Sequence, residues 1–197
     1  MHTKIGLLLL VMLASQITAT PIFKQINSDE ILILAEKSYQ PDTTIGGSTF
    51  KNNSQNTFGI QLPFINDVQI GFNIDFFSLI PKNTTTKREY KIRAITPNIL
   101  QNKIINPKLT QFYGVKVPVN IIAYKESGTI DKGDDEHIAL GIEPLIGTSL
   151  SLYKTIFIQL KFSTLISYLP KLSHEQETNP KENIVYCLPK FSFSIIF

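Results

Sequence analysis

The stretch FSFSIIF, residues 191–197, decides the fold class of this chain. Apolar side chains fall at every second position, with serines between the first three of them. This period of two predicts a β-strand with one apolar face. An apolar strand at the edge of an open sheet would pair with other chains and aggregate, so the pattern favours a sheet that closes on itself. The apolar positions are Phe191, Phe193, Ile195 and Phe197.

The beginning of the sequence, MHTKIGLLLLVMLASQITATP, has the features of a secretory signal peptide. Lys4 provides a positive charge, residues 5–13 are apolar, and Ala19 is a small residue at which cleavage is expected. The apolar run is shorter than the ~20 residues of a membrane-spanning helix. An uncleaved anchor helix is the alternative. We therefore predict a signal peptide at 1–19 and a single domain at 20–197.

Composition excludes several classes of function. The chain has 19 Lys and Arg against 16 Asp and Glu, and this near balance argues against nucleic acid as a partner, because such partners select basic surfaces. A hydrophobic content of 43% is too low for a bundle of membrane helices. Cys187 is the only cysteine, so neither an internal disulfide nor a cysteine-rich zinc cluster is expected.

Period-two alternation predicts about eight antiparallel strands. Seven of them are predicted at 58–62, 68–76, 89–94, 114–123, 138–143, 156–163 and 185–197. Residues 30–37 form either an eighth strand or a short helix capped by Ser28. The even strand number of closed bacterial barrels favours the strand.

The connections between these strands differ in length. Four of them are long and polar, at 38–56, 78–87, 125–136 and 169–183, whereas those at 64–67 and 147–153 are short. The connection at 97–111 is too long for a turn, so it either contains a small helix at 99–105 or indicates a wrong strand count. Prolines 118, 144 and 189 fall inside predicted strands, where each removes a hydrogen-bond donor.

The predicted strands have one apolar face and one face with charges of both signs. Such charges cannot line a dry core without a large desolvation cost. The sheet is therefore either wetted on its charged face, or closed with the charges inside and the apolar face outside. In the closed arrangement the lumen-facing charges are Asp75, Glu89, Lys91, Arg93, Lys116, Glu143, Lys161 and Lys190. The lipid-facing side chains are then Val68, Ile70, Phe72, Ile74, Val117, Val119, Ile156, Ile158, Leu160 and Phe162.

Three segments resemble the small bacterial outer-membrane β-barrel proteins, the group that includes the OmpA barrel, OmpX, OmpW and the opacity-like proteins. They are the terminal FSFSIIF, FYGVKVPVNI at 112–121 and HIALGIEPLIGTSLSLYKTIFIQLKF at 137–162. The resemblance implies an all-β, antiparallel up-and-down transmembrane barrel. It also implies passage by periplasmic chaperones to the outer-membrane assembly machinery, which would read Phe191, Phe193, Ile195 and Phe197 as its signal. The chain departs from the group in its strand prolines and in having no Trp.

Two clusters of residues suggest a cation site or a hydrolase site. His137 follows the acidic residues 134–136, as a cation site would require, but the spacing of a calcium loop is absent and a solvated loop fits better. Ser173 and His174 are adjacent, as in a lipid-modifying hydrolase, but adjacency in sequence does not provide catalytic geometry. We predict no enzymatic activity, no metal and no cofactor.

The sequence thus predicts an envelope or surface protein in the outer membrane of a Gram-negative bacterium, structural or adhesin-like. At eight strands the side chains fill the interior, so no open pore is expected. Membrane lipid is one partner, and the external loops would bind a host or extracellular ligand. The competing hypothesis is a secreted or periplasmic soluble β-barrel or sandwich that binds an apolar ligand.

Overall fold

The computed structural model describes residues 31–45, 48–51, 53–65, 67–82, 88–126, 136–153, 156–169 and 184–197. The predicted signal peptide at 1–19 lies outside these ranges and stays a prediction. No helix within them is long and apolar enough to cross a membrane. The strands are β1 (Leu32–Gln40), β2 (Thr43–Ile45), β3 (Ser48–Phe50), β4 (Asn53–Ile65), β5 (Val68–Leu79), β6 (Arg88–Asn106), β7 (Leu109–Lys116), β8 (Val119–Glu126), β9 (His137–Tyr153), β10 (Ile156–Leu169) and β11 (Ile184–Ile196).

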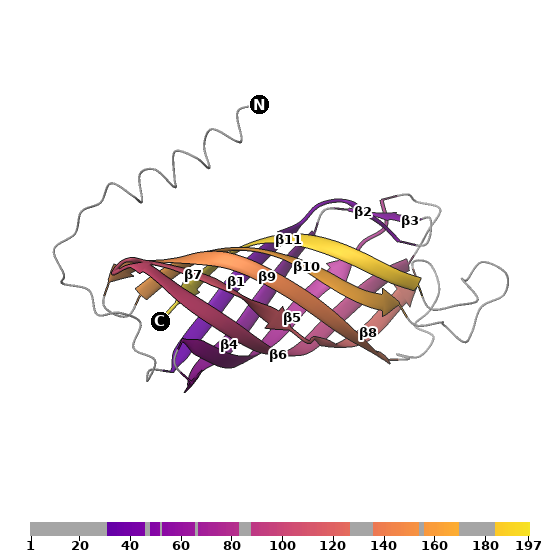
Figure 1. Cartoon of the computed structure of the whole chain (residues 1–197). Coiled ribbons are helices and arrows are strands. Elements are labelled where there is room, and N and C mark those ends of the chain that lie inside the picture. Colours follow the sequence, from indigo (N-terminus) through magenta and orange to yellow (C-terminus); the bar gives the residue numbers. More distant parts are fainter. Residues whose placement is uncertain are drawn as a thin grey trace, which may run out of the picture.

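Nine of these strands form one closed antiparallel ring with eight positions (Figure 1). β7 and β8 share a position, because both pair with β6 and with β9 and only Val117 and Pro118 separate them. The ring closes where β1 pairs with β11, and the backbones of Ile33 and Phe197 exchange two hydrogen bonds of 3.0 Å there. The prediction of an eight-stranded up-and-down barrel is therefore confirmed. Residues 32–40 form a strand rather than a helix.

The two ends of the barrel differ. At the end that we call the turn end, short turns join β4 to β5, β6 to β7 and β9 to β10. The opposite end, which we call the loop end, carries the hairpin of β2 and β3, and this hairpin lies far from the C-terminus in Figure 1. The long connections predicted at 78–87, 125–136 and 169–183 lie largely outside the described residues.

The alternative of a small helix at 99–105 is wrong. β6 runs through this segment to Asn106 and pairs with β7 over residues 98–106. A tight turn at Pro107 and Lys108 reverses the chain, and Asn106 Oδ1 accepts hydrogen bonds of 2.9 Å from the amides of Lys108 and Leu109. The segment 97–111 is long because most of it belongs to β6 and β7, and the turn that Asn106 stabilises needs only two residues.

The prolines lie where a missing donor is tolerated. Pro118 is buried at the gap between β7 and β8, and the ring continues there because the Gly141 amide donates to the Pro118 carbonyl at 2.9 Å. Pro144 lies in β9 where the pairing with β10 is interrupted between Leu145 and Ile142, whereas Pro189 lies inside β11 opposite Thr164. Pro63 coincides with a register shift between β4 and β5, which is a common place for a strand proline.

The barrel has polar side chains inside and apolar side chains outside over most of its height. Along β5, Gln69, Asn73 and Asp75 are buried, while Phe72 and Ile74 between them are exposed. The same alternation holds on β10 and β11, where Lys161 and Lys190 are buried and Phe162 and Phe191 are exposed. A soluble barrel has the opposite polarity, because water outside and a dry interior sort the residues the other way.

Three apolar clusters fill the interior at its two ends. The turn end holds one cluster of Leu32, Leu34, Phe157 and Ile196 and a second of Leu100, Phe112 and Leu145. The loop end holds a larger one, into which the β2–β3 hairpin inserts its side chains. Its members are Ile45, Phe50, Phe77, Leu79, Ile92, Ile122, Ala139, Leu165, Leu169, Tyr186 and Leu188. The buried charges therefore lie between apolar clusters, and further buried polar side chains such as Thr110 and Ser149 lie at the turn end.

The apolar cap at the loop end explains an error in the predicted lumen residues. Lys91 and Arg93 are exposed rather than buried, and Glu89 is half-buried. Their neighbours Ile92 and Ala94 point inward instead, because the interior at this level is apolar and Ile92 packs in the loop-end cluster. At the loop end apolar residues face inward as well. The alternation of polar and apolar residues therefore predicted the wrong face for Lys91 and Arg93 of β6.

Candidate functional site: the sealed lumen and the outer face

Two buried glutamates organise the middle layer. Glu36 of β1 is bound by the ammonium of Lys161 from β10, and it accepts hydrogen bonds from Ser38 at 3.1 Å and Ser194 at 3.2 Å. Glu143 of β9 is bound by Lys190 of β11 at 2.7 Å and by Ser163 at 2.8 Å.

Lys116 of β7 joins the two glutamates. Its Nζ lies 3.7 Å from a carboxylate oxygen of Glu36 and 3.7 Å from one of Glu143, and no hydrogen-bond acceptor lies closer. Five strands thus contribute to one ionic network. We call Glu36, Lys116, Glu143, Lys161 and Lys190 the lumen network.

The third buried acid lies beside this network and is held by hydroxyl groups. Asp75 of β5 accepts a hydrogen bond of 2.5 Å from Thr57 of β4 and another of 2.5 Å from Thr96 of β6. With Asp75 included, three buried lysines face three buried acids. This balance is required, because an unpaired charge taken out of water destabilises a fold by several kcal/mol.

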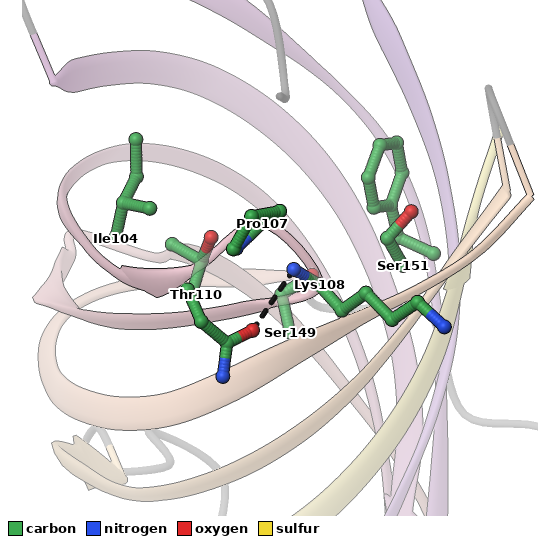
Figure 2. A pocket seen from close by; sticks show the side chains of 8 residues that line it. Ile104, Pro107, Lys108, Thr110, Ser149 and Ser151 are labelled. Atoms are coloured by element: carbon green, nitrogen blue, oxygen red, sulfur yellow. Dashed lines mark hydrogen bonds between the residues drawn. The ribbon is translucent and has the colours of Figure 1, made fainter. Parts of the chain in front are cut away.

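The middle of the lumen is filled by the side chains of the lumen network. Apolar clusters lie on both sides of the lumen network, and at the turn end buried polar side chains such as Gln69, Thr110 and Ser149 lie beside them. Figure 2 shows a pocket at the turn end, lined by Ile104, Pro107, Lys108, Thr110, Ser149 and Ser151 among others, with a volume of about 10 Å³. That space is about the size of one water molecule. The pocket can hold one water molecule.

The mouth at the loop end is closed by the β2–β3 hairpin. Ile45 and Phe50 are buried, and the Phe50 ring meets that of Tyr90 edge to face at 6.0 Å. The hairpin is also tied to the segment after β5, because the amide of Lys51 donates to the Ile80 carbonyl at 2.8 Å and Lys82 forms an ion pair of 2.8 Å with Asp42. The β2–β3 hairpin is therefore part of the packed structure.

The outer face is an apolar belt around the ring. Its members come from every strand position and include Ile33, Phe58, Ile60, Phe72, Ile74, Ile95, Ile99, Tyr113, Val117, Ile142, Ile146, Phe162, Ile166, Phe191 and Phe193, all exposed. A groove of about 360 Å³ lies in this face between β5, β6 and β7, beside Tyr113 and Ile99. Lys37 is exposed on β1, and its ammonium lies 5.9 Å from the ring centroid of Tyr39.

The predicted site residues divide between the two faces. Of the eight predicted lumen charges, five are buried inside: Asp75, Lys116, Glu143, Lys161 and Lys190. The ten predicted lipid-facing residues are exposed or partly exposed, and the terminal Phe191, Phe193 and Phe197 are exposed as well. Sequence reasoning missed Glu36. The continuous apolar run at 31–34 hid the alternation that puts Leu34, Glu36 and Ser38 on one face.

The candidate chemistry found in the sequence receives no support from the described residues. Ser173, His174 and the acidic residues 134–135 lie outside them, and His137 is half-buried at the start of β9. No group of three or more metal-binding side chains occurs within the described ranges. Cys187 is exposed on β11.

Comparison with solved structures identifies the architecture. Neisserial surface protein A matches with a TM-score of 0.64 at 10% identity, over 84% of this chain and 95% of that protein. This chain has the fold of the small outer-membrane β-barrels. The attachment invasion locus protein of Yersinia pestis matches at 0.50 and 10% identity, over 86% of this chain and 99% of its own. The outer membrane protein OprG from Pseudomonas aeruginosa matches at 0.51 and 9% identity, over 86% and 96%.

The likeness is one of structure, since no protein-family model and no curated protein matches the sequence. Because only about one residue in ten is identical, the likeness concerns the fold of the chain. The predicted resemblance to this structural group is confirmed.

Proposed function

We propose that this chain is a surface protein of the outer membrane of a Gram-negative bacterium, exported by the signal at 1–19. The observation that carries the proposal is the reversed polarity of the barrel. Large apolar side chains such as Phe72, Ile74 and Phe162 are exposed outside, and charges such as Lys116 and Glu143 are buried inside. In water this distribution would expose a belt of apolar surface far larger than soluble monomers have, whereas lipid satisfies it.

The same observation argues against the competing hypothesis. A soluble barrel that binds an apolar ligand needs an apolar cavity inside, and the middle of this barrel is occupied by the lumen network. The turn-end pocket, at about 10 Å³, is too small for such a ligand.

Within the membrane we propose a structural or adhesin-like role in which the loop end meets the outside and binds a host or extracellular ligand. Two features support this. The lumen is filled, so the barrel would not act as a diffusion pore, and the β2–β3 hairpin gives the loop end a fixed platform. Phe197, hydrogen-bonded to Ile33, would serve with Phe191, Phe193 and Ile195 as the signal for the assembly machinery after periplasmic chaperones deliver the chain.

The test is fractionation of cells that express the full chain. We expect recovery in carbonate-washed outer membranes, a shift in gel mobility when the sample is heated, and cleavage by external protease at the loop end alone. Release of the folded protein into the soluble periplasm would refute the membrane location. A stepwise conductance in planar bilayers would refute the sealed lumen independently.

A further inference from the structure

The outer wall of the barrel is not uniform around the ring. On β6, Lys91 and Arg93 are exposed near the loop end and Glu89 is half-buried beside them. On β9, β10 and β11 every lysine and glutamate is buried inside the barrel. The outward face of these three strands therefore carries no lysine or carboxylate, and we call it the uncharged wall.

The uncharged wall is taller than the hydrocarbon layer of a membrane. On β9 its exposed residues extend from Leu152 at the turn end to Ile138 at the loop end, fourteen residues apart. Fourteen residues in a strand tilted by ~40° rise roughly 35 Å, whereas the apolar band of such barrels is about 25 Å tall. At the turn end β4 and β6 also expose apolar side chains at their last positions, Phe64 and Ile105. The excess of roughly 10 Å on β9 therefore lies at the loop end.

The excess apolar surface is continuous across three strands. Ile166 of β10 pairs with Ile142 of β9, and Tyr168 of β10 pairs with Val185 of β11. The Tyr168 hydroxyl also donates a hydrogen bond of 3.4 Å to the Ile138 carbonyl, which ties β10 to β9 at the loop end. We call the following side chains the loop-end patch: Ile138, Leu140, Ile142, Ile166, Tyr168 and Val185.

The register of the ring compares the level of this patch with that of the β6 cations. Arg93 of β6 pairs with Ile121 of β8, and Ile121 pairs in turn with Ile138 of β9. Two strands away from an exposed guanidinium, the outer wall thus presents an exposed isoleucine. Charged side chains on a barrel wall belong outside the hydrocarbon, so the loop-end patch at this level needs a cover other than lipid chains.

We propose that the loop-end patch is the contact surface between two copies of this chain in the outer membrane. The inference rests on the proposed membrane location and adds a partner to it. Copies in one membrane share their orientation and depth, so their patches lie at the same height. A two-fold axis parallel to the barrel axis brings the same surface of each copy together.

The chemistry and the size of the patch both fit a second copy. A charged partner surface would lose hydration against the patch without gaining an opposite charge, whereas a second copy offers the same uncharged side chains. Val185 is 70% exposed and Ile138 is 66% exposed, and the six side chains together present roughly 500 Å² of apolar surface. A symmetric dimer would then bury roughly 1,000 Å² in total, which is the lower limit for a specific interface.

The test is thiol cross-linking in outer membranes that contain the full chain. Cys187 is exposed on β11 and pairs with Ile166, so it lies beside the patch. With a short bismaleimide, which joins two thiols, we expect a band of twice the monomer mass that persists when the expression level is lowered. Ile166→Cys combined with Cys187→Ser moves the thiol into the patch and should give the same band. Absence of the band with both thiols would overturn the proposal.

Two variants on the opposite wall provide the controls. Leu140→Lys should weaken dimerisation about tenfold or more, because each copy would bury an unpaired ammonium. Phe76→Lys adds the same charge at an exposed position of β5, four ring positions from β10, and should leave the cross-linking unchanged. Phe76→Cys combined with Cys187→Ser should not form the band. Equal loss with both lysine variants, or equal cross-linking through Phe76→Cys, contradicts an interface at the loop-end patch.

The heat-dependent gel shift and fractionation, recorded for every variant, separate this proposal from the membrane location. A folded barrel that stays monomeric in outer membranes refutes the dimer alone. A cross-link to a different protein refutes the second copy as the occupant of the patch. If Leu140→Lys does not give the gel shift, Val185→Lys near the start of β11 serves as the second variant, with the same loss expected and unchanged cross-linking refuting the interface.

Discussion

The buried carboxylate of Glu36 allows the sharpest test of the lumen network. Glu36→Gln keeps the size of the side chain and removes its charge, which leaves the ammonium of Lys161 without its anion. Lys161 is only 4% exposed, and Lys116 lies 3.7 Å from the same carboxylate, so two buried cations lose a partner at once. At about 4 Å and an effective dielectric constant of ~20, one such contact is worth about 4 kcal/mol.

Removing one partner of a buried ion pair typically destabilises a protein by 3–5 kcal/mol. Because the glutamine oxygen still accepts from Lys161, we expect the lower end of that range, a loss of about 3 kcal/mol in the free energy of unfolding. The assay is urea unfolding of the barrel in lipid vesicles, with the folded fraction read from the heat-dependent gel shift. Adding Lys161→Met to Glu36→Gln should recover part of the loss, since the orphaned cation is then gone.

The control is Lys37→Met, which removes a charge from the neighbouring residue of β1 on the exposed outer face. This variant should unfold at or above the urea concentration of the wild type, because a cation on the apolar belt is unfavourable in lipid. The reasoning is refuted if Glu36→Gln unfolds at the wild-type concentration. It is also refuted if the double variant is no more stable than Glu36→Gln.

Three further outcomes follow from the same geometry. Lys116→Met should lower the free energy of unfolding by about 1–2 kcal/mol in the same urea assay, which is less than the loss expected for Glu36→Gln, because Glu36 and Glu143 each keep another lysine. A larger loss would contradict the geometry of the network. Gly147→Ala should destabilise the barrel by about 1–3 kcal/mol, because its Cβ would lie 2.4 Å from the Phe112 ring and 2.5 Å from the carbonyl oxygen of Leu160. Deletion of Phe197 removes both hydrogen bonds to Ile33 and should lower the yield of assembled barrel in outer membranes, whereas unchanged assembly would show that this residue is dispensable.

The middle of the barrel could be predicted from the sequence because one physical rule governs it. Where the apolar belt lies outside and the lumen network inside, alternation assigns each residue of β5 and β10 to a face, and Asp75 and Lys161 are buried on the side opposite Phe72 and Phe162. The same alternation predicted seven of the eight strands, and the first was chosen because closed barrels have an even number of strands.

The loop end and the first strand could not be predicted in this way. At the loop end the interior is apolar because the β2–β3 hairpin packs into it, and this tertiary contact reverses the meaning of the alternation around Lys91 and Arg93. In β1, apolar residues face both directions at 31–34, since Leu32 and Leu34 fill the turn-end cap while Ile33 lies outside. Glu36 was therefore missed although it is central to the lumen network.

The pairing of β1 with β11 also determines the order in which the barrel can form. Ile33 and Phe197 are separated by nearly the whole described sequence, so their contact has a high loop-closure entropy and contributes to slow folding. While β11 is missing, β1 and β10 both keep a free edge. We expect hairpins such as β4–β5 to form before β1 pairs with β11, because their strands are close in sequence, and we expect full resistance to unfolding only once that pairing closes the ring.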